Sequence, residues 1–108
     1  MEKLRQTTSL GTVAYLQAGD PARPPVLFIH GIPTSSWLWR DVLRLLRNDF
    51  NCIAPDLMGL GDTEVDPDRV PLHMDSQAEM LLELMDELGH ETFSVVAHDQ
   101  GGAAAQIL

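Results

Sequence analysis

Basic residues are scarce in this chain. Of its 108 residues only 7 are Lys or Arg, against 16 that are Asp or Glu, which gives a formal net charge of −9. Affinity for nucleic acid comes largely from basic side chains that neutralise phosphates. The composition therefore argues against a nucleic-acid partner.

Cysteine is nearly absent, and long apolar runs are missing altogether. The single Cys52 excludes an internal disulfide framework, and we expect it to be a buried thiol in a strand. No unbroken aliphatic or aromatic run exceeds the four residues of 26–29, which is far too short to span a bilayer. The N-terminus lacks the apolar core of a secretory signal. We therefore predict a cytoplasmic protein with no membrane partner.

Metal and cofactor signatures are missing as well. The chain has no Cys-x-x-Cys and no His-Glu-x-x-His, the spacings that are typical of zinc sites. Gly59 and Gly61 form a Gly-x-Gly pair without the third glycine of a dinucleotide fingerprint, and no Walker A pattern occurs. We predict neither a metal nor a cofactor.

Short strands alternate with amphipathic helices along the chain. The expected strands are 11–18, 26–29, 50–54 and 92–97, with 4–9 as a hairpin partner of the first. The expected helices are about 37–47, capped by Ser35 or Ser36, and a second one that begins at a Ser76–Glu79 capping box and ends at Gly89. Their predicted buried stripes are Leu38, Val42, Leu45 and Leu46 in the first helix and Ala78, Leu81, Leu82, Met85 and Leu88 in the second. This alternation predicts an α/β fold, a mostly parallel sheet with flanking helices, in one domain at most.

Ligands of such sheets bind beyond the carboxyl ends of the strands, so function is expected in the loops after residues 29, 54 and 97. The first loop begins with His30 and Gly31. Gly31 allows a backbone turn that a side chain would block, and Pro33 fixes its own φ. Such a loop can direct the Ile32 N–H inward, although an ordinary strand-to-helix connector has the same composition. In the second loop we expect Asp56 to hydrogen-bond within the loop rather than to act in catalysis.

The third loop has the layout of a nucleophile elbow. Asp99 follows the apolar strand 92–97, stands where a serine is usual, and is flanked by the small residues Ala97 and Gly101. A side chain at a sharp strand-to-helix turn is forced into the cleft, and the helix N-terminus behind it stabilises negative charge. The alternative is that Asp99 is a helix N-cap, a position that favours aspartate.

In order and spacing, the three loops together resemble the α/β-hydrolase superfamily, from about Gly11 to the last residue. An aspartate elbow is similar to the branch that contains epoxide hydrolases and haloalkane dehalogenases. This resemblance implies that Asp99 attacks an electrophilic carbon of a small-molecule substrate and forms an alkyl ester, which a histidine-activated water then hydrolyses. It further implies that the backbone N–H groups of Ile32 and Gln100 stabilise the oxyanion. The residues His30, Gly31, Pro33 and Gly101 would shape the loops.

The resemblance favours an epoxide hydrolase over a haloalkane dehalogenase. Dehalogenases typically hold the halide with a tryptophan after the nucleophile and an asparagine after His-Gly, where this chain has Gln100 and Ile32. Epoxide hydrolases also commonly carry that tryptophan, but an apolar residue is normal for them at the position of Ile32. A dehalogenase-like hydrolase stays open as the alternative, because the run 30–36 is similar to dehalogenases, and so does a catalytically inactive fragment or binding module.

The resemblance also predicts that residues 1–108 are the N-terminal portion of a single α/β-hydrolase domain, truncated after the elbow. In the family the base histidine and the acid that orients it come downstream of the elbow. The four histidines of this chain do not match that base: we expect His30 to shape its loop, His98 to pack at the elbow, and His73 and His90 to face solvent. The isolated chain should therefore be inactive, and its exposed edge strand 92–97 is expected to promote self-association.

Overall fold

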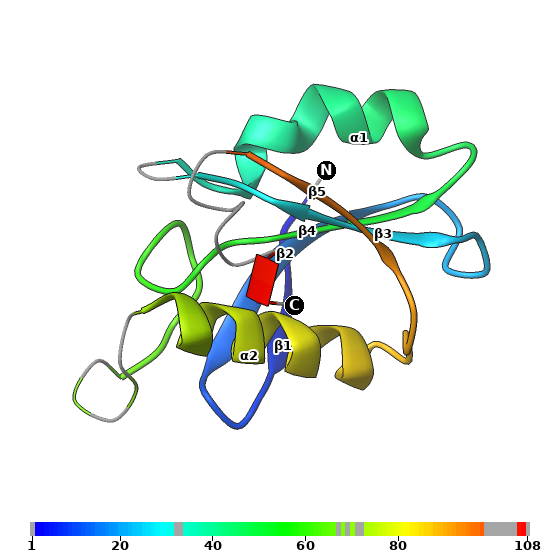
Figure 1. The fold of residues 1–108 in the computed structure, drawn as a ribbon. Helices are drawn as coiled ribbons and strands as arrows, with labels where there is room; N and C mark the ends of the chain where they lie inside the picture. The colour runs from blue at the N-terminus through cyan, green and yellow to red at the C-terminus, as the bar shows by residue number, and fades with distance from the viewer. Residues whose placement is uncertain are drawn as a thin grey trace.

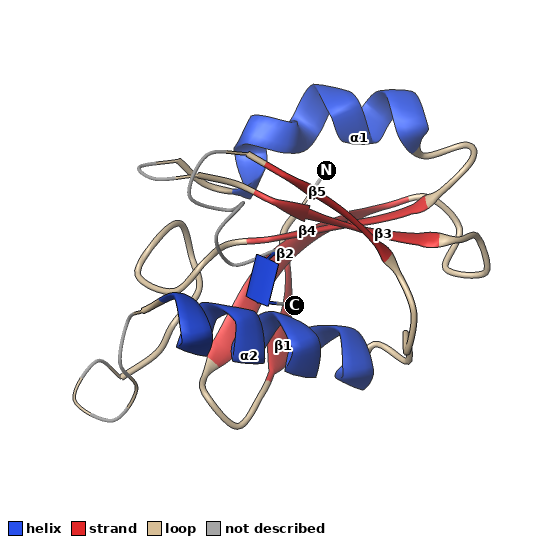
Figure 2. Cartoon of the chain, viewed as in Figure 1, coloured by secondary structure: helices blue, strands red, loops and turns tan. Residues whose placement is uncertain are grey.

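The computed structural model describes residues 2–31, 34–66, 68, 70, 73–98 and 106–107, and these form one mixed sheet with helices on both faces (Figures 1 and 2). In chain order the elements are β1 (Leu4–Thr7), β2 (Thr12–Ala18), β3 (Pro25–Ile29), the 3₁₀ helix η1 (Ser36–Trp39), α1 (Arg40–Leu46), β4 (Asn51–Pro55), α2 (Met74–Glu87) and β5 (Ser94–Ala97). The predicted α/β class is confirmed.

Five strands make up the sheet of the described residues, in the order β1-β2-β4-β3-β5. The first two strands pair antiparallel with each other, and β2 pairs antiparallel with β4. The strands β4, β3 and β5 are parallel. Because parallel strands end at the same edge of a sheet, the loops after β3, β4 and β5 leave from one edge, as the sequence predicted.

Alternate residues of each strand point to opposite faces and build two apolar clusters. The cluster beneath α2 consists of Val13, Tyr15, Leu27, Ile29, Ile53, Leu57, Met58, Val70, Met80, Leu81, Leu84 and Met85. The cluster beneath α1 consists of Leu16, Ala18, Val26, Phe28, Leu43, Cys52 and Ala54. Cys52 is fully buried in β4, as expected of a structural thiol. The inner strands β2, β4 and β3 are therefore covered on both faces.

The inner face of α1 differs from the predicted stripe. Leu45 is 79% exposed and Leu38 is 40% exposed, whereas Leu43 is fully buried. The first turn, η1, is a 3₁₀ helix, which has 3.0 residues per turn in place of 3.6. The turn shifts Leu38 relative to a continuous α-helix. Within α1, the predicted Val42 and Leu46 do pack against the cluster, and Leu45 does not.

The start of α2 was also predicted incorrectly. The helix begins at Met74, and the ring of His73 caps it by accepting a hydrogen bond from the N–H of Ser76. Ser76 is therefore inside the helix and buried. Leu82, expected in the buried stripe, is 46% exposed. Gly89 follows the helix with a φ of 84°, as predicted for its C-terminal end.

Candidate functional site

The carboxyl ends of β3, β4 and β5 are followed directly by His30, Asp56 and His98. The N–H of His98 donates to the carbonyl of Ile29 at 3.0 Å, which extends the pairing of β5 with β3 by one residue. His98 is the last described residue after β5, and Asp99 is the next residue in the sequence. Five predicted site residues lie outside the described residues, namely Ile32, Pro33, Asp99, Gln100 and Gly101.

His30 is fully buried, and both of its ring nitrogens are engaged. Its Nδ1 donates to the carbonyl of Gly31 at 2.7 Å, and its Nε2 accepts the N–H of Leu57 at 2.9 Å. These two bonds require the neutral ring with its proton on Nδ1. Burial lowers the pKa of His30, an effect that outweighs the opposing hydrogen bond to Gly31. The ring therefore joins the loop after β3 to the loop after β4.

The carbonyl oxygen of Gly31 has two further donors, both from Thr34. The Thr34 hydroxyl lies 2.6 Å from this oxygen and the Thr34 N–H lies 3.1 Å from it. Sequence reasoning did not single out Thr34, although a threonine three residues after a turn glycine is a known pattern for such a side-chain bond. The Gly31 oxygen is thus held by three donors.

Asp56 is a buried carboxylate with a complete set of partners. It accepts the N–H of Ser36 at 2.7 Å, the N–H of Asp62 at 2.9 Å and the Nζ of Lys3 at 2.7 Å. Lys3 also pairs with the Asp62 carboxylate at 2.9 Å. Lys3 lies 53 residues from Asp56 in the chain, and no local sequence pattern indicates that pair.

The contacts between Lys3 and Asp56 favour the charged form of both side chains. Burial by itself would raise the pKa of Asp56, but hydrogen bonds from the Asp62 N–H, Lys3 and the Ser36 N–H outweigh it and lower the pKa. Burial would lower the pKa of Lys3, but its bonds to Asp56 and Asp62 outweigh burial and raise the pKa. The contacts of Asp56 are therefore those of a structural carboxylate that keeps its charge.

The loop after β4 is fixed along its length by further contacts. The Thr63 hydroxyl donates to the Asp56 carbonyl at 2.7 Å. On α2, Gln77 accepts the Met58 N–H at 2.7 Å and donates to the Met58 carbonyl at 3.2 Å. Gly61 has a φ of 55°, and a Cβ there would lie 2.3 Å from the carboxylate of Asp56. Only glycine fits at that position without displacing the carboxylate.

The other three histidines occupy different places. His73 caps α2, as described above, and is exposed. His90 is half-buried rather than solvent-facing, and its Nε2 accepts from the side-chain amide of Asn51 at 3.1 Å. His98 is exposed at the end of β5.

Among the described residues, no three His, Cys, Asp or Glu side chains gather as a metal site would require. In the same part of the chain, no helix is both long enough and apolar enough to cross a bilayer.

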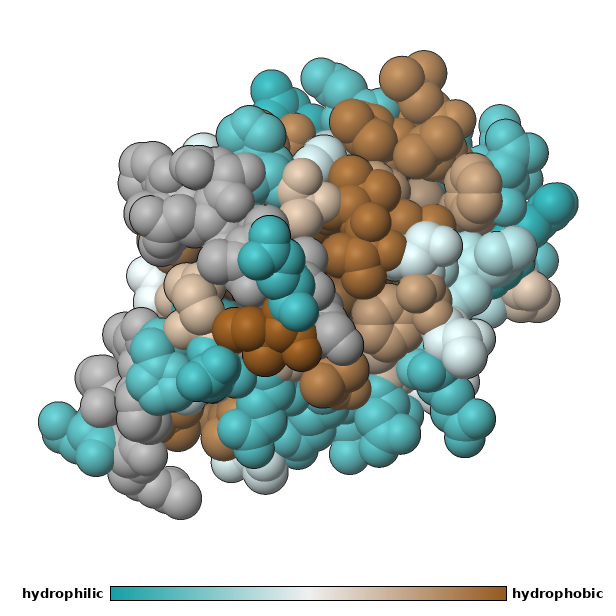
Figure 3. Space-filling model, in the orientation of Figure 1, coloured by the Kyte–Doolittle hydropathy of each residue, from teal (hydrophilic) through white to brown (hydrophobic). Residues whose placement is uncertain are grey.

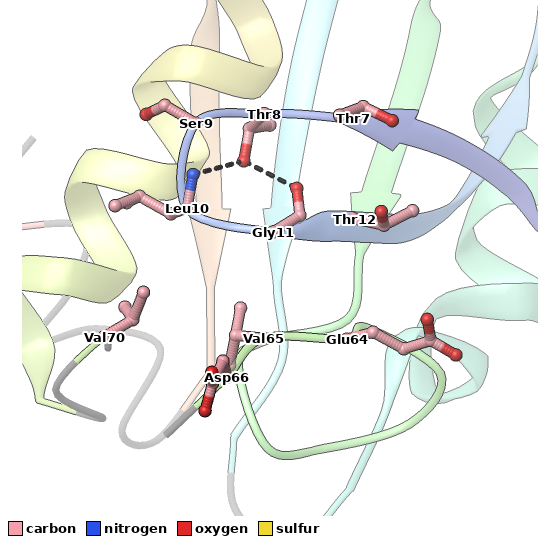
Figure 4. Close-up of a pocket in the computed structure, with 10 residues that line it drawn as sticks. All are labelled: Thr7, Thr8, Ser9, Leu10, Gly11, Thr12, Glu64, Val65, Asp66 and Val70. Carbon is pink, nitrogen blue, oxygen red and sulfur yellow. Dashed lines mark hydrogen bonds between the residues drawn. The ribbon is translucent and has the colours of Figure 1, made fainter. Parts of the chain in front are cut away.

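A pocket of about 550 Å³ lies between the β1–β2 hairpin and residues 64–66 (Figure 4). Its lining includes Thr7, Thr8, Ser9, Leu10, Gly11, Thr12, Glu64, Val65, Asp66 and Val70. The Thr8 hydroxyl is used within the hairpin, where it donates to the Gly11 carbonyl and accepts the Leu10 N–H. The Ser9 hydroxyl donates to Glu83. Neither His30 nor Gly31, the two predicted site residues that the structure describes, lines this pocket.

Comparison with known proteins identifies relatives of two activities. Haloalkane dehalogenase 2 of Mycobacterium tuberculosis is 37% identical over 95 residues, which are 88% of this chain and 32% of that protein. The soluble epoxide hydrolase of Corynebacterium sp. is 38% identical over 91 residues, 84% of this chain and 30% of that protein. The chain spans about a third of the length of these relatives.

The fold agrees with these relationships. The structure of the haloalkane dehalogenase DbeA from Bradyrhizobium elkani superposes with a TM-score of 0.87 at 38% identity, over 96% of this chain and 35% of that chain. A family model described as the alpha/beta hydrolase fold matches residues 24–108. Because that match covers most of the sequence, this chain belongs to the α/β-hydrolase fold family.

Proposed function

We propose that the whole protein is a hydrolase that uses Asp99 as its nucleophile, with a reaction of the epoxide hydrolase type. The observation that carries this proposal is the position of β5. It lies beside β3, parallel to it, and the bond from the His98 N–H to the Ile29 carbonyl keeps the two strands together up to the residue before Asp99. An aspartate that follows this strand starts at the same sheet edge as the His30–Gly31 loop.

The chemistry follows from a carboxylate at that edge. One oxygen of Asp99 attacks a ring carbon of the epoxide, the carbon–oxygen bond of the ring breaks, and an acid protonates the departing oxygen. Water then attacks the carbonyl carbon of the ester and gives its proton to a base, which releases a diol and restores the carboxylate. The N–H groups of Ile32 and Gln100 would stabilise the oxyanion of the second step. By its resemblance to the family, we expect the base to be a histidine that follows Asp99 in chain order.

A carboxylate suits the first step because it is already ionised at neutral pH and needs no base to activate it. Its alkyl ester, in contrast, needs an activated water. In this proposal the 108-residue chain alone would be alkylated without turnover.

Dehalogenation is the second candidate, since a relative at 37% identity and a structure at 38% identity carry that name. The residues themselves favour the epoxide. A halide ion leaving a carbon needs side-chain N–H donors, and Ile32 offers none, while Gln100 offers a single amide. An epoxide oxygen needs a proton donor instead and places no such demand on Ile32.

Parallel assays of the whole protein test the proposal. Diol formation would be followed from styrene oxide and bromide release from 1-bromobutane, for the wild type and for Asp99→Asn. We expect diol formation, little bromide release, and loss of both activities in Asp99→Asn. Asp41→Asn, on the exposed side of α1, is the matched control and should keep full activity.

A single turnover in oxygen-18 water identifies the nucleophile independently. The ester mechanism places label in the peptide that carries Asp99, because water attacks the carbonyl of the enzyme rather than the substrate. An active Asp99→Asn variant, or a wild type that incorporates no label, contradicts the nucleophile. Binding of the epoxide by the wild type without any turnover would instead indicate a binding module.

A further inference from the structure

We propose that a further pocket of the structure binds a small neutral molecule that carries one apolar ring and a hydroxyl group. The pocket has a volume of about 210 Å³ and lies on the face of the sheet that α2 covers. Asn51, which lines it, is the first residue of β4, whereas Asp56 follows the last one. The pocket is therefore at the other end of β4 from the loops of the candidate site, and this inference does not depend on the proposed function.

Three strands and the end of α2 form the apolar wall of the pocket. Leu4 of β1 lies opposite Tyr15 of β2, and Gln17 of β2 lies opposite Ile53 of β4. Opposite residues of paired strands share a face, and so do Tyr15 and Gln17, because they are two residues apart. Leu88, which follows α2, adds a further apolar side chain. A ring that enters here replaces water on mostly hydrocarbon surface.

The hydroxyl of Tyr15 is a polar group without a partner in this pocket. Tyr15 is only 7% exposed, and burial raises the pKa of its hydroxyl with no hydrogen bond to any described residue that offsets it. In the same part of the chain, the wholly buried side-chain polar atoms without a partner are Ser36 Oγ and Trp39 Nε1. The Tyr15 hydroxyl is not among them, so it is still reached from the pocket that Tyr15 lines. Buried tyrosine hydroxyls usually have a hydrogen-bond partner, which a ligand would supply here.

Three polar side chains beside Tyr15 hold one another in a fixed orientation. The carbonyl of Gly19 can only accept, so the Gln17 atom 2.7 Å from it is the amide nitrogen Nε2. The same nitrogen donates to Asn51 Oδ1 at 2.9 Å, and Asn51 Nδ2 then donates to His90 Nε2 at 3.1 Å. A neutral imidazole that accepts at Nε2 carries its proton on Nδ1. The acceptor Gln17 Oε1 and the donor His90 Nδ1–H are thus left without a partner among the residues that the structure describes.

The lining sets the chemistry of the ligand. None of the described residues that line the pocket is an acid, a lysine or an arginine, so a neutral ligand is favoured. An apolar cavity of about 150 Å³ holds benzene, and the 210 Å³ of this pocket therefore hold one ring with a small substituent. A hydroxyl group both donates and accepts. It can donate to Gln17 Oε1 and accept from His90 Nδ1–H or Tyr15, and phenols are the simplest molecules that combine these features.

Fluorine NMR titrations of the whole protein test the proposal with two probes. 4-Fluorophenol carries the ring and the hydroxyl, and fluorobenzene is the matched probe without the hydroxyl. We expect a Kd on the order of 1 mM for 4-fluorophenol, as is typical of so small a ligand. Fluorobenzene should bind about 5-fold more weakly, because it lacks the hydrogen bonds. A 4-fluorophenol that does not bind, or that binds no better than fluorobenzene, would overturn the proposal.

Tyr15→Phe removes the hydroxyl and keeps the ring. It should weaken 4-fluorophenol about 5-fold and leave fluorobenzene unchanged. The midpoint of urea unfolding should also stay at the wild-type value, because the hydroxyl has no partner among the described residues to lose. A lower midpoint would reveal a partner elsewhere in the whole protein, and it would overturn the inference as surely as unchanged binding of 4-fluorophenol.

A pair of leucine variants locates the bound probe. Leu4 lines the pocket and is 47% exposed, whereas Leu82 is 46% exposed and does not line it. Leu4→Trp fills the pocket from its exposed side and should weaken both probes about 10-fold, the effect of overpacking. Leu82→Trp, the matched control, should bind both probes like the wild type. Binding of 4-fluorophenol that is unchanged in Leu4→Trp, or equally weakened in both variants, would overturn the assignment of this pocket.

Discussion

The carboxylate of Asp56 and the backbone N–H of Ser36 lie 2.7 Å apart, twenty residues distant in sequence. A second bond joins the same two loops in the opposite sense, because the N–H of Leu57 donates to the ring of His30 at 2.9 Å. Each loop therefore supplies one donor and one acceptor to the other. These two bonds tie the loops after β3 and β4 to each other at the edge of the sheet where β5 also ends.

Removal of the Asp56 carboxylate should strongly destabilise the protein. Asp56 is fully buried and the Lys3 side chain is only 9% exposed. Asp56→Ala leaves Lys3 without its main partner and two backbone N–H groups without an acceptor, which should cost about 3–5 kcal/mol. The loss would be measured as a change in the free energy of unfolding in urea.

Asp41→Ala is the matched control, since Asp41 pairs with Arg44 at 3.3 Å on the surface of α1. Both side chains are largely exposed, so this change should stay within about 0.5 kcal/mol. Similar losses for the two variants would contradict the structural role of Asp56.

The free energy of unfolding should fall as the pH drops below 6.5, the ordinary pKa of histidine. The pKa of His30 lies below its usual value of 6.5 in the folded protein, chiefly because of burial. Between the folded and the ordinary pKa the unfolded chain binds more protons, so stability rises with pH in that window. The contribution of His30 is therefore complete above pH 6.5 and is lost as the pH falls below it.

Unfolding free energies between pH 8 and pH 5 would check this dependence. His30→Asn removes the titrating group and should give a flatter curve, although it is less stable at pH 8. A His30→Asn curve parallel to that of the wild type would exclude His30 as the source.

Two glycines with positive φ should differ sharply in their tolerance of a side chain. A Cβ at Gly61 would lie 2.3 Å from the Asp56 carboxylate, whereas a Cβ at Gly89 would meet nothing within 4 Å. Gly89→Ala should cost about 1–2 kcal/mol for its left-handed backbone alone. Gly61→Ala should cost about 1–3 kcal/mol beyond that, because the carboxylate must also move. Urea midpoints of the two variants test this order, and equal midpoints would contradict it.

The isolated 108-residue chain should self-associate through β5. No strand of the described residues pairs with the outer edge of β5, and Val95 and Val96 are 38% and 39% exposed. Apolar surface extends over this strand between α1 and α2 (Figure 3). Unpaired apolar edges favour pairing with another chain. Sedimentation of the purified chain should show oligomers, and Val95→Lys should shift them toward monomer, whereas a monomeric wild type that melts cooperatively would contradict the prediction.

The sequence alone determined the class of fold and the order of its parts. The apolar run of 26–29 and the β-branched strand 92–97 are local signals, and each strand ends where a polar residue follows. Parallel pairing then follows from the alternation of strands and helices, because a crossover returns the chain to the same end of the sheet. The prediction of an elbow around Asp99 rests on the same kind of local pattern, since the small residues Ala97 and Gly101 flank it in the sequence.

Tertiary structure decided the contacts that support the site. Lys3 and Asp56, Ser36 and Asp56, and His30 and Leu57 are pairs separated by many residues, and no periodicity reports them. The predicted buried stripe of α2 was right at Ala78, Leu81 and Met85 and wrong at Leu82. The stripe of the first helix was wrong at Leu38 and Leu45, because helical spacing alone does not say which residues at the border of a face meet the sheet. Local patterns record the propensity of a segment, whereas the partner of a buried charge is set by where the folded chain brings its distant segments together.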